Sequence, residues 1–195
     1  MKLYTTLKLL QECNACQPRY DHLVEALGPK WSNTKHIPLS LILELNGFSD
    51  AIWACRAVPE AQHAERDKRL RLFACDVVEH VLHIFESKYP DDKRPRACIE
   101  TARQFAIGLA TNDQRIVARK NNARDAAADY AAAADYAAAY VARAAAYTAD
   151  YTADANAYAA ADYAAAYAAD AAAYARGTER EWQAERLGGV LDGQD

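Results

Sequence analysis

A run of alanines in the second half of the chain limits the folds open to it more than any other feature. Alanine occupies 30 of the 52 residues from 125 to 176, and most of the others are tyrosine or aspartate. Alanine is the best intrinsic helix former, and neither glycine nor proline interrupts the sequence between Gly108 and Gly177. The run therefore predicts helices, and no alternating strand pattern is found elsewhere in the chain.

The alanine run contains an internal repeat. Residues 134–147 (ADYAAAYVARAAAY) and 161–174 (ADYAAAYAADAAAY) agree at 12 of 14 positions, 27 residues apart. At about 100° per residue, one straight helix would present the two copies on opposite faces. We favour an antiparallel hairpin that turns within residues 148–156, where Thr, Asp and Asn weaken the helix and offer caps. A single rod of roughly 90 Å is the alternative.

The first 110 residues have the varied composition of a globular domain. They contain a short leucine stripe and a longer apolar stripe at helical spacing. Short helices are expected over residues 38–45 and 50–57, with Ser49 as the N-cap of the second. The stripes are formed by Leu3, Leu7 and Leu10, and by Leu70, Phe73, Val77, Val81, Ile84 and Phe85.

Two capping signals mark further helix starts. Residues 111–114 have the Thr-x-x-Gln form of a capping box, and residues 178–181 have the Thr-x-x-Glu form. The second signal predicts a short terminal helix that ends before Gly188-Gly189. The sequence thus predicts an all-α protein in three parts: a compact multi-helix domain (1–110), an Ala/Tyr/Asp-rich helical arm (111–176), and a short terminal helix and tail (177–195).

Charge is distributed unevenly along the chain. Residues 1–124 carry 19 Lys/Arg and 15 Asp/Glu, a net charge of +4, whereas residues 125–195 carry 4 and 12, a net charge of −8. The acidic part should repel nucleic acid, so we expect no direct nucleic-acid partner. The same acidic part suits a protein partner that has a basic surface, because it could compete with nucleic acid for that surface.

Membrane and secretory signals are missing from the sequence. The longest strongly apolar runs, such as residues 39–45, are far shorter than the roughly 20 residues that span a bilayer. The five cysteines are odd in number, and no signal-peptide pattern begins the chain. We therefore expect no membrane partner, reduced thiols and a cytoplasmic location.

Cys13-x-x-Cys16 is the first candidate for metal chemistry, with His22 downstream as a third ligand. A structural zinc site needs four ligands, commonly from a second paired motif, and the other three cysteines are isolated in the sequence. We interpret Cys13 and Cys16 instead as small, half-buried residues at the end of a helix and in the following turn.

A histidine-bearing helix is the second candidate. Glu79, His80, His83 and Glu86 have spacings found in di-metal helical bundles, but such bundles draw these groups from several helices. We interpret the four residues as a polar flank beside the apolar stripe. The sequence therefore predicts no metal, no cofactor and no catalytic residue, with an enzyme that uses this helix as the remaining alternative.

Tyrosine is the most unusual side chain of the alanine run: the protein has 12 tyrosines against four phenylalanines and three tryptophans. The rings could cover an alanine-rich helix within the chain, or they could bind a partner, because tyrosine offers large contact area at little entropy cost. Both interpretations stay open. The predicted partner-binding residues are these tyrosines and neighbouring aspartates: Tyr136, Tyr140, Tyr147, Tyr151, Tyr158, Tyr163, Tyr167, Tyr174, Asp135, Asp150, Asp154 and Asp162.

Several short motifs outside the run are specific enough to compare with a family. They are NG (46–47), DAIW (50–53), FAC (73–75), EHVL (79–82), YPDD (89–92) and RPR (94–96), followed by an alanine-rich aromatic tail and WQAERL (182–187). This pattern resembles the immunity-protein-5-like family, whose members occur in bacteria, including polymorphic-toxin settings, and have relatives in phages. The regular tyrosines and aspartates of the tail depart from the family pattern.

The resemblance implies an all-helical protein that neutralises another protein, with no catalytic motif to carry over. We therefore expect a non-enzymatic inhibitor of a toxin, nuclease or host-defence complex, acting at a basic nucleic-acid-binding surface. It would work in the cytoplasm of a bacterial cell, as an immunity protein, or in a phage-infected host, as an anti-CRISPR-like counter-defence protein. The alternative is a structural or assembly protein that self-associates, and a homodimer is compatible with either interpretation.

Overall fold

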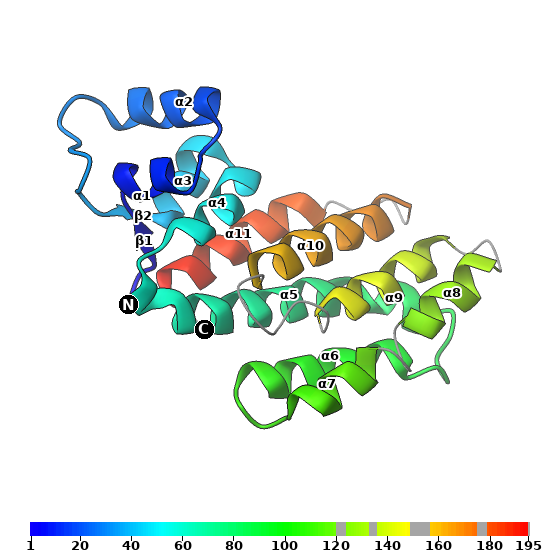
Figure 1. Cartoon of the computed structure of the whole chain (residues 1–195). Coiled ribbons are helices and arrows are strands. Elements are labelled where there is room, and N and C mark those ends of the chain that lie inside the picture. The colour runs from blue at the N-terminus through cyan, green and yellow to red at the C-terminus, as the bar shows by residue number, and fades with distance from the viewer. Residues whose placement is uncertain (120–123, 133–135, 149–156, 175–178, 195) are drawn as a thin grey trace. The chain divides into compact units, whose positions relative to one another are not determined.

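The computed structural model describes residues 1–119, 124–132, 136–148, 157–174 and 179–194 (Figure 1). Helices account for 77% of the structure, which confirms the predicted all-α class. A small strand pair was not predicted: β1 (Tyr4–Thr5) runs antiparallel to β2 (Ile37–Pro38), with Thr5 opposite Ile37. Within the described residues, no helix is both long enough and apolar enough to cross a membrane.

Residue contacts group the chain into two compact units. Unit 1 comprises residues 1–66 and 184–195, and unit 2 comprises residues 67–183. These divisions fall inside two helices and differ from the boundaries at 110 and 176 expected from composition. Contact grouping does not measure independent folding, so the three predicted domains remain a prediction.

Unit 1 is a small helical unit whose core comes from both ends of the chain. Its leucine stripe is buried as predicted, and Thr6 caps the first helix by accepting from the amide of Leu9 at 3.1 Å. The elements are β1, α1 (Leu7–Glu12), α2 (Gln17–Leu27), β2, α3 (Leu39–Asn46), α4 (Phe48–Ala54), η1 (Cys55–Ala57), η2 (Glu60–Gln62), the first residues of α5 (His63–Glu86) and the end of α11 (Glu179–Asp192).

The predicted N-cap at Ser49 is wrong. Helix α4 begins at Phe48, and Gly47 occupies the N-cap position with φ 85°. This left-handed conformation favours glycine, and it lets α4 start directly after α3 ends. The predicted helix over residues 50–57 is therefore the body of α4 followed by the η1 turn.

The terminal helix runs further than predicted. Helix α11 continues through the glycine pair to Asp192, whereas the sequence indicated an end before the glycines. Leu187 and Leu191 are buried, and the amide of Leu3 donates to the carbonyl of Leu191 at 3.0 Å. This packing outweighs the roughly 1 kcal/mol that a glycine costs inside a helix.

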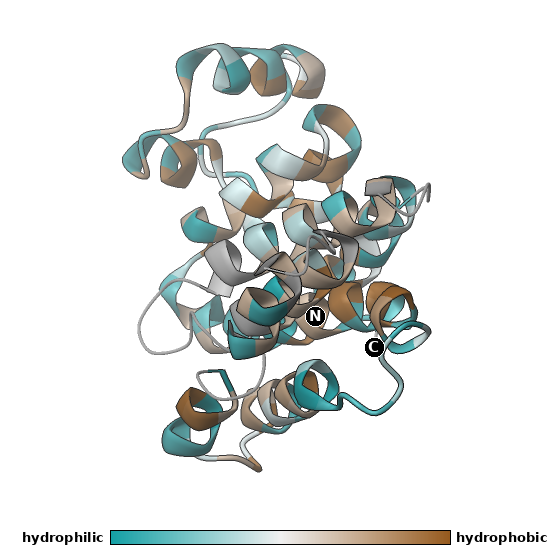
Figure 2. Cartoon of the chain, turned by 90° about the vertical axis from the view of Figure 1, so that its right-hand side faces the viewer, coloured by the Kyte–Doolittle hydropathy of each residue, from teal (hydrophilic) through white to brown (hydrophobic). Residues whose placement is uncertain are grey.

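Unit 2 contains the histidine helix and the alanine run. Its helices carry both polar and apolar stretches, as expected for helices with one buried face (Figure 2). The apolar stripe of α5 is buried as predicted, except that Ile84 is half-buried. The elements are the rest of α5, α6 (Arg94–Ala106), α7 (Asn112–Ala118), α8 (Arg124–Ala132), α9 (Tyr136–Thr148), α10 (Ala157–Tyr174) and the start of α11.

The first predicted capping box is confirmed. Thr111 Oγ1 accepts from the amide of Gln114 at 3.2 Å, and Gln114 Oε1 accepts from the amide of Thr111 at 2.8 Å. Thr178, which opens the second predicted box, lies outside the described residues.

Helix α9 is surrounded by other helices of unit 2. It packs against α6, α8 and α10, and Ala138, Val141, Ala142 and Ala145 are buried. Alanine allows this arrangement because its small side chain lets helices approach closely on several sides. The Cys98 thiol of α6 even reaches the backbone carbonyl of Ala145, at 3.3 Å.

The two repeat copies form a packed pair of helices, as the hairpin prediction requires. Helix α9 ends at Thr148, α10 begins at Ala157, and the two helices contact one another along their length (Figure 1). The single rod is therefore wrong. Before α10, the predicted arm contains α7, α8 and α9 as separate elements, and α8 packs on α9.

A spin-label distance tests the packed pair. Labels at Arg143→Cys and Asp170→Cys, both exposed sites, should lie within about 20 Å because packed helix axes are about 8–10 Å apart. A continuous rod would place them about 40 Å apart. Cys13→Ser and Cys16→Ser remove the accessible thiols, and burial raises the pKa of Cys55, Cys75 and Cys98 to about 12, so these remain unlabelled.

Candidate partner-binding face

Helix α10 has a buried alanine face and an exposed face that carries tyrosine and aspartate. Ala161, Ala164, Ala165, Ala168 and Ala171 are all fully buried within unit 2. On the exposed side, Tyr163 is 44% exposed, Asp162 precedes it in the same turn, and Asp170 lies about two turns further along; both aspartates are exposed. We call Asp162, Tyr163 and Asp170 the α10 face.

Asp170 was not among the residues predicted to bind a partner, whereas Asp162 and Tyr163 were. The spacing could have indicated it, because Asp170 lies seven residues after Tyr163, which returns to nearly the same side of a helix after about two turns. Only the buried faces of the alanine residues show which side of α10 is outward, and composition does not reveal that.

Tyr140 and Tyr167 have a different role from Tyr163. Their rings stack with centroids 5.9 Å apart and planes at 29°, and both side chains are half-buried. The Arg143 guanidinium lies 5.5 Å from the centre of the Tyr167 ring, in reach of a cation–π interaction. These two tyrosines therefore join α9 to α10, which is the intramolecular role that the sequence left open.

The other predicted partner-binding residues are not placed by the structure. Four of them, Asp135, Asp150, Tyr151 and Asp154, lie outside the described residues. Another four, Tyr136, Tyr147, Tyr158 and Tyr174, belong to α9 and α10, but their side chains are outside the described part of the structure.

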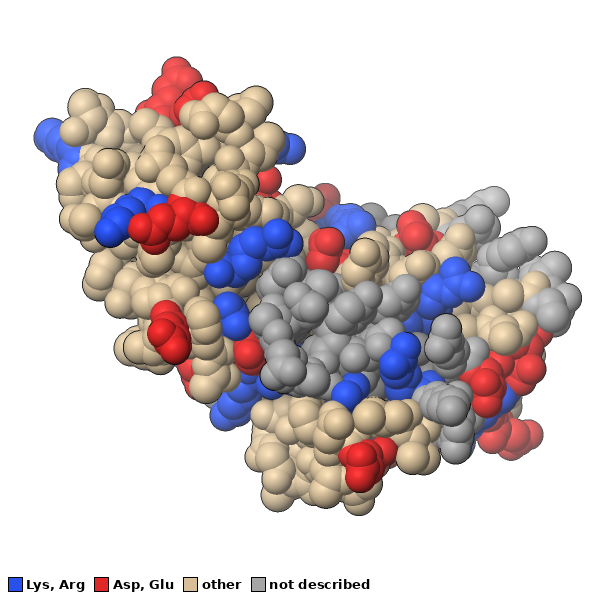
Figure 3. Space-filling model, in the orientation of Figure 1, with Lys and Arg blue, Asp and Glu red and all other residues tan. Residues whose placement is uncertain are grey.

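Acidic residues also gather at the α8 end of unit 2 (Figure 3). Asp129 of α8 pairs with Arg94 at 2.8 Å, and Arg94 also holds Asp92 at 2.7 Å. Asp91, which precedes Asp92, and Asp125, in the first turn of α8, are also exposed. Because one arginine holds two of these carboxylates, this end is less available for a cationic partner than the α10 face.

The histidine helix serves as a structural support. His80 Nδ1 lies 2.7 Å from the Glu179 carboxylate, and the His80 ring stacks on Trp182 with centroids 3.9 Å apart and planes at 1°. The Glu179 side chain is only 3% exposed. Gln183 donates both to Glu179, at 3.1 Å, and to the carbonyl of Ala165, at 3.0 Å. This group joins α5 and α10 to the start of α11.

The other polar residues of this helix form ion pairs with α6. Arg103 reaches Asp76 at 2.8 Å and Glu79 at 2.6 Å, and Arg96 reaches Glu86 at 2.6 Å. The hydrogen bonds from Arg96 lower the pKa of Glu86, which keeps it ionised. Glu79 and Glu86 thus have arginine partners, as expected for a polar flank.

Cys13 and Cys16 lie at the end of α1 and at the start of α2. Cys13 is the C-cap of α1, and its thiol is 3.8 Å from the carbonyl of Arg56. Cys16 is exposed at the N-cap of α2, while His22 Nδ1 lies 3.2 Å from the Asn46 side-chain oxygen. The described residues contain no group of three or more His, Cys, Asp or Glu placed to hold a metal ion.

The arginines in the first turns of α5 make contacts within the protein. Arg66 and Arg69 are buried, and Arg66 donates to the carbonyl of Cys55 at 3.3 Å. Arg71 lies 5.6 Å from the centre of the Phe105 ring. These side chains therefore contribute to packing rather than to an exposed basic patch.

Paired alanine substitutions test the structural role of His80. His80→Ala removes the partner of a buried carboxylate and a stacked ring, so we expect a loss of about 1–3 kcal/mol in the free energy of unfolding. His83→Ala, three residues away and exposed, should change it by less than about 0.5 kcal/mol. Urea denaturation followed by circular dichroism measures both. An equal loss of unfolding free energy in the two variants would contradict the structural role of His80.

Comparison with protein families gives a match that covers unit 2. The chain matches the family described as "Imm-5 like putative immunity protein" over residues 60–189, about two thirds of its length. Searches of curated proteins and of solved structures find no significant match. The matched stretch includes the His80 support, α9 and the α10 face. The chain therefore belongs to the Imm-5-like family of immunity proteins.

Proposed function

We propose that this protein is a non-enzymatic inhibitor that binds and neutralises another protein through the α10 face. The observation that carries the proposal is the exposure of Tyr163 between two exposed aspartates, on a helix whose other side is buried alanine. A large ring held on a rigid helix loses little entropy on binding, and tyrosines of this kind are frequent hot spots.

The family supports the direction of this proposal. An immunity protein acts by binding a toxin, so a face built for protein contact is the feature expected of a member. The preferred partner is a toxin or nuclease with a basic nucleic-acid-binding surface, because the segment that carries the face has a net charge of −8. A phage counter-defence protein, of the anti-CRISPR kind, would use the same face against a host nuclease complex.

The geometry around the remaining candidates supports a non-catalytic mode of action. His80 stacks on Trp182 and holds a buried carboxylate, so its nitrogen is engaged in joining helices. Burial raises the pKa of Cys55, Cys75 and Cys98 to about 12, which keeps these thiols protonated and unreactive at neutral pH.

Two tyrosines on the same helix provide a matched test. The gene product encoded beside this chain's gene is co-expressed as the toxin, and survival and the dissociation constant are measured. Tyr163→Ala should weaken binding at least thirtyfold, about 2 kcal/mol, and should lower the unfolding free energy by less than about 1 kcal/mol. Tyr167→Ala should instead lower the unfolding free energy by about 1–2 kcal/mol, because its ring packs on Tyr140.

The outcome of this pair decides whether the α10 face is used. If Tyr163→Ala is fully protective against the toxin while remaining folded, the α10 face is not the binding surface. If the neighbouring gene product does not bind at all, plaque formation on a CRISPR-immune host, with and without the protein, tests the counter-defence form.

The charge of the α10 face should control the rate of association. Asp162→Asn with Asp170→Asn removes two exposed carboxylates and should slow association with a basic partner several-fold at low salt. The effect should shrink at 0.5 M salt, where the Debye length falls to about 4 Å. Asp21→Asn, an exposed carboxylate of α2, is the control and should leave the rate unchanged. An effect on dissociation alone would contradict electrostatic steering.

Self-association is the second candidate function, and an exposed apolar cluster favours it. Leu109 is 75% exposed and Val117 is 55% exposed, and Ile107 and Ile116 are also exposed in the same α6–α7 region. Light scattering over a concentration series distinguishes the two functions. A monomer at all concentrations supports the inhibitor. Oligomers that Leu109→Ser and Val117→Ser abolish would support assembly through this cluster.

A further inference from the structure

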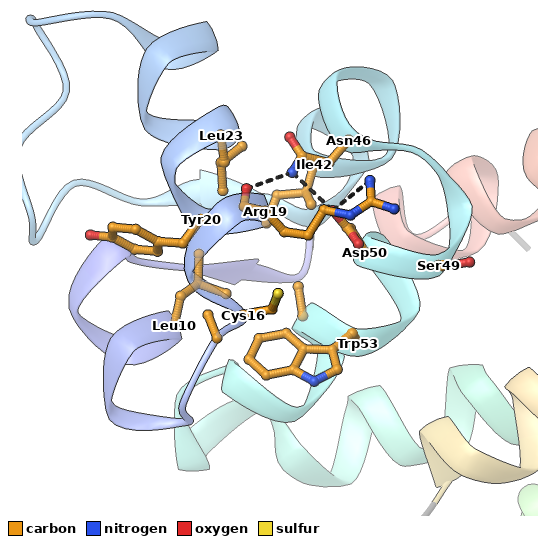
Figure 4. Close-up of a pocket in the computed structure, with 12 residues that line it drawn as sticks. Leu10, Cys16, Arg19, Tyr20, Leu23, Ile42, Asn46, Ser49, Asp50 and Trp53 are labelled. Carbon is orange, nitrogen blue, oxygen red and sulfur yellow. Dashed lines mark hydrogen bonds and ion pairs between the residues drawn. The ribbon is translucent and has the colours of Figure 1, made fainter.

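Unit 1 contains a cavity that the proposed function does not use. Its volume is about 230 Å³, and it lies between the α1–α2 turn and helices α2, α3 and α4 (Figure 4). The volume exceeds the roughly 150 Å³ of a cavity that holds benzene, and it is below the roughly 300 Å³ at which sites for drug-sized ligands begin. The cavity therefore has room for one ring with a small substituent.

The walls of this cavity are apolar and partly aromatic. Leu10, Leu23 and Ile42 are buried side chains that line it, and Tyr20 and Trp53 contribute rings. The hydroxyl of Tyr20 points away from the cavity (Figure 4). Flat, apolar walls of this kind favour an aromatic occupant, since ring–ring contacts add to the gain from burying apolar surface.

One hydrogen-bond acceptor interrupts the apolar lining. Asp50 of α4 lines the cavity, and its side chain is 18% exposed. Its Oδ2 accepts from the Asn46 amide at 2.9 Å and lies 3.7 Å from the Arg19 guanidinium. Both contacts use Oδ2, so within the described residues Oδ1 is left to accept from an occupant.

Asn46 holds this acceptor in place. Its amide nitrogen donates to the carbonyl of Arg19 at 3.0 Å as well as to Asp50, and its oxygen faces His22 Nδ1 at 3.2 Å. One side chain thereby joins α2, α3 and α4 around the cavity. The site is preorganised, because occupancy requires no rearrangement of these helices.

We propose that this cavity is a binding site for an aromatic ring that carries one hydrogen-bond donor, a phenol or an indole, with Asp50 as the acceptor. The ring fills the space between Tyr20 and Trp53, and its hydroxyl or N–H donates to the Asp50 carboxylate. The loose pair with Arg19, whose side chain is 63% exposed, neutralises the carboxylate and disfavours a cationic occupant. The site lies wholly within residues 10–54 and does not rest on the proposed function.

The test uses p-cresol, toluene and benzylamine as probes, added to the full chain and followed by the NMR signal of the Trp53 indole N–H. We expect p-cresol to bind at least about tenfold more tightly than toluene, because a hydrogen bond to a charged acceptor has that size. Equal binding of toluene, preferred binding of benzylamine, or no shift of the Trp53 signal with any probe would overturn the proposal.

Two variants assign the selectivity to Asp50. Asp50→Asn should reduce the preference for p-cresol over toluene to less than about threefold while leaving the weaker toluene binding in place. Asp21→Asn, on the neighbouring α2 helix but outside the cavity lining, should retain the full preference. A preference that survives Asp50→Asn unchanged would show that another group recognises the donor.

Cys16 supplies an independent readout, because its exposed thiol lines the cavity. In a Cys13→Ser background, saturating p-cresol should slow alkylation of Cys16 severalfold, and toluene at the same concentration should slow it less, in proportion to its weaker binding. Unchanged alkylation under saturation would contradict binding at this place.

N-acetyl-tyrosinamide then identifies the source of the ring. Binding comparable to p-cresol means that a protein side chain can enter, and binding of p-cresol alone means a free small molecule.

Discussion

Close approach of helices through alanine is the interaction on which unit 2 depends. Helix α9 is surrounded by α6, α8 and α10, and Ala138, Ala142 and Ala145 are almost fully buried. Burying a methyl group yields little free energy, but alanine also loses no side-chain entropy on folding. Larger side chains at these positions would separate the helices, and the contact between the Cys98 thiol and the Ala145 carbonyl would be lost.

The repeat explains how this packing is made symmetric. Tyr140 and Tyr167 occupy the same position in the two copies, and they stack on one another. In an antiparallel pair of like helices, equivalent residues meet where the helices cross, as in a two-fold interface between identical subunits. The copies differ where the first has Arg143 and the second has Asp170. Both side chains are exposed, but Arg143 lies over the Tyr167 ring of the other copy, whereas Asp170 belongs to the α10 face.

Local signals in the sequence predicted the elements well, because they depend on residues close together in the chain. The all-α class, the capping box at Thr111 and the helical conformation of the two repeat copies follow from propensity and short-range hydrogen bonds. The predicted end of the terminal helix was wrong, because Leu187 and Leu191 are buried and Leu191 accepts a hydrogen bond from Leu3, at the other end of the chain. For the same reason, the sequence did not distinguish Tyr163, which is exposed, from Tyr167, which packs on Tyr140.

The cavity in unit 1 and the α10 face differ in their relation to the family. The family match begins at residue 60 and includes the α10 face, whereas all residues that line the cavity lie between 10 and 54. Two of the motifs that carried the family resemblance, NG (46–47) and DAIW (50–53), lie before the matched residues, and they contribute Asn46, Asp50 and Trp53 to the cavity. Each has a role in the cavity: the Asn46 side chain donates a hydrogen bond that orients Asp50, and Trp53 forms part of the wall. The two places share no residue, so a substitution at one leaves the residues of the other in place.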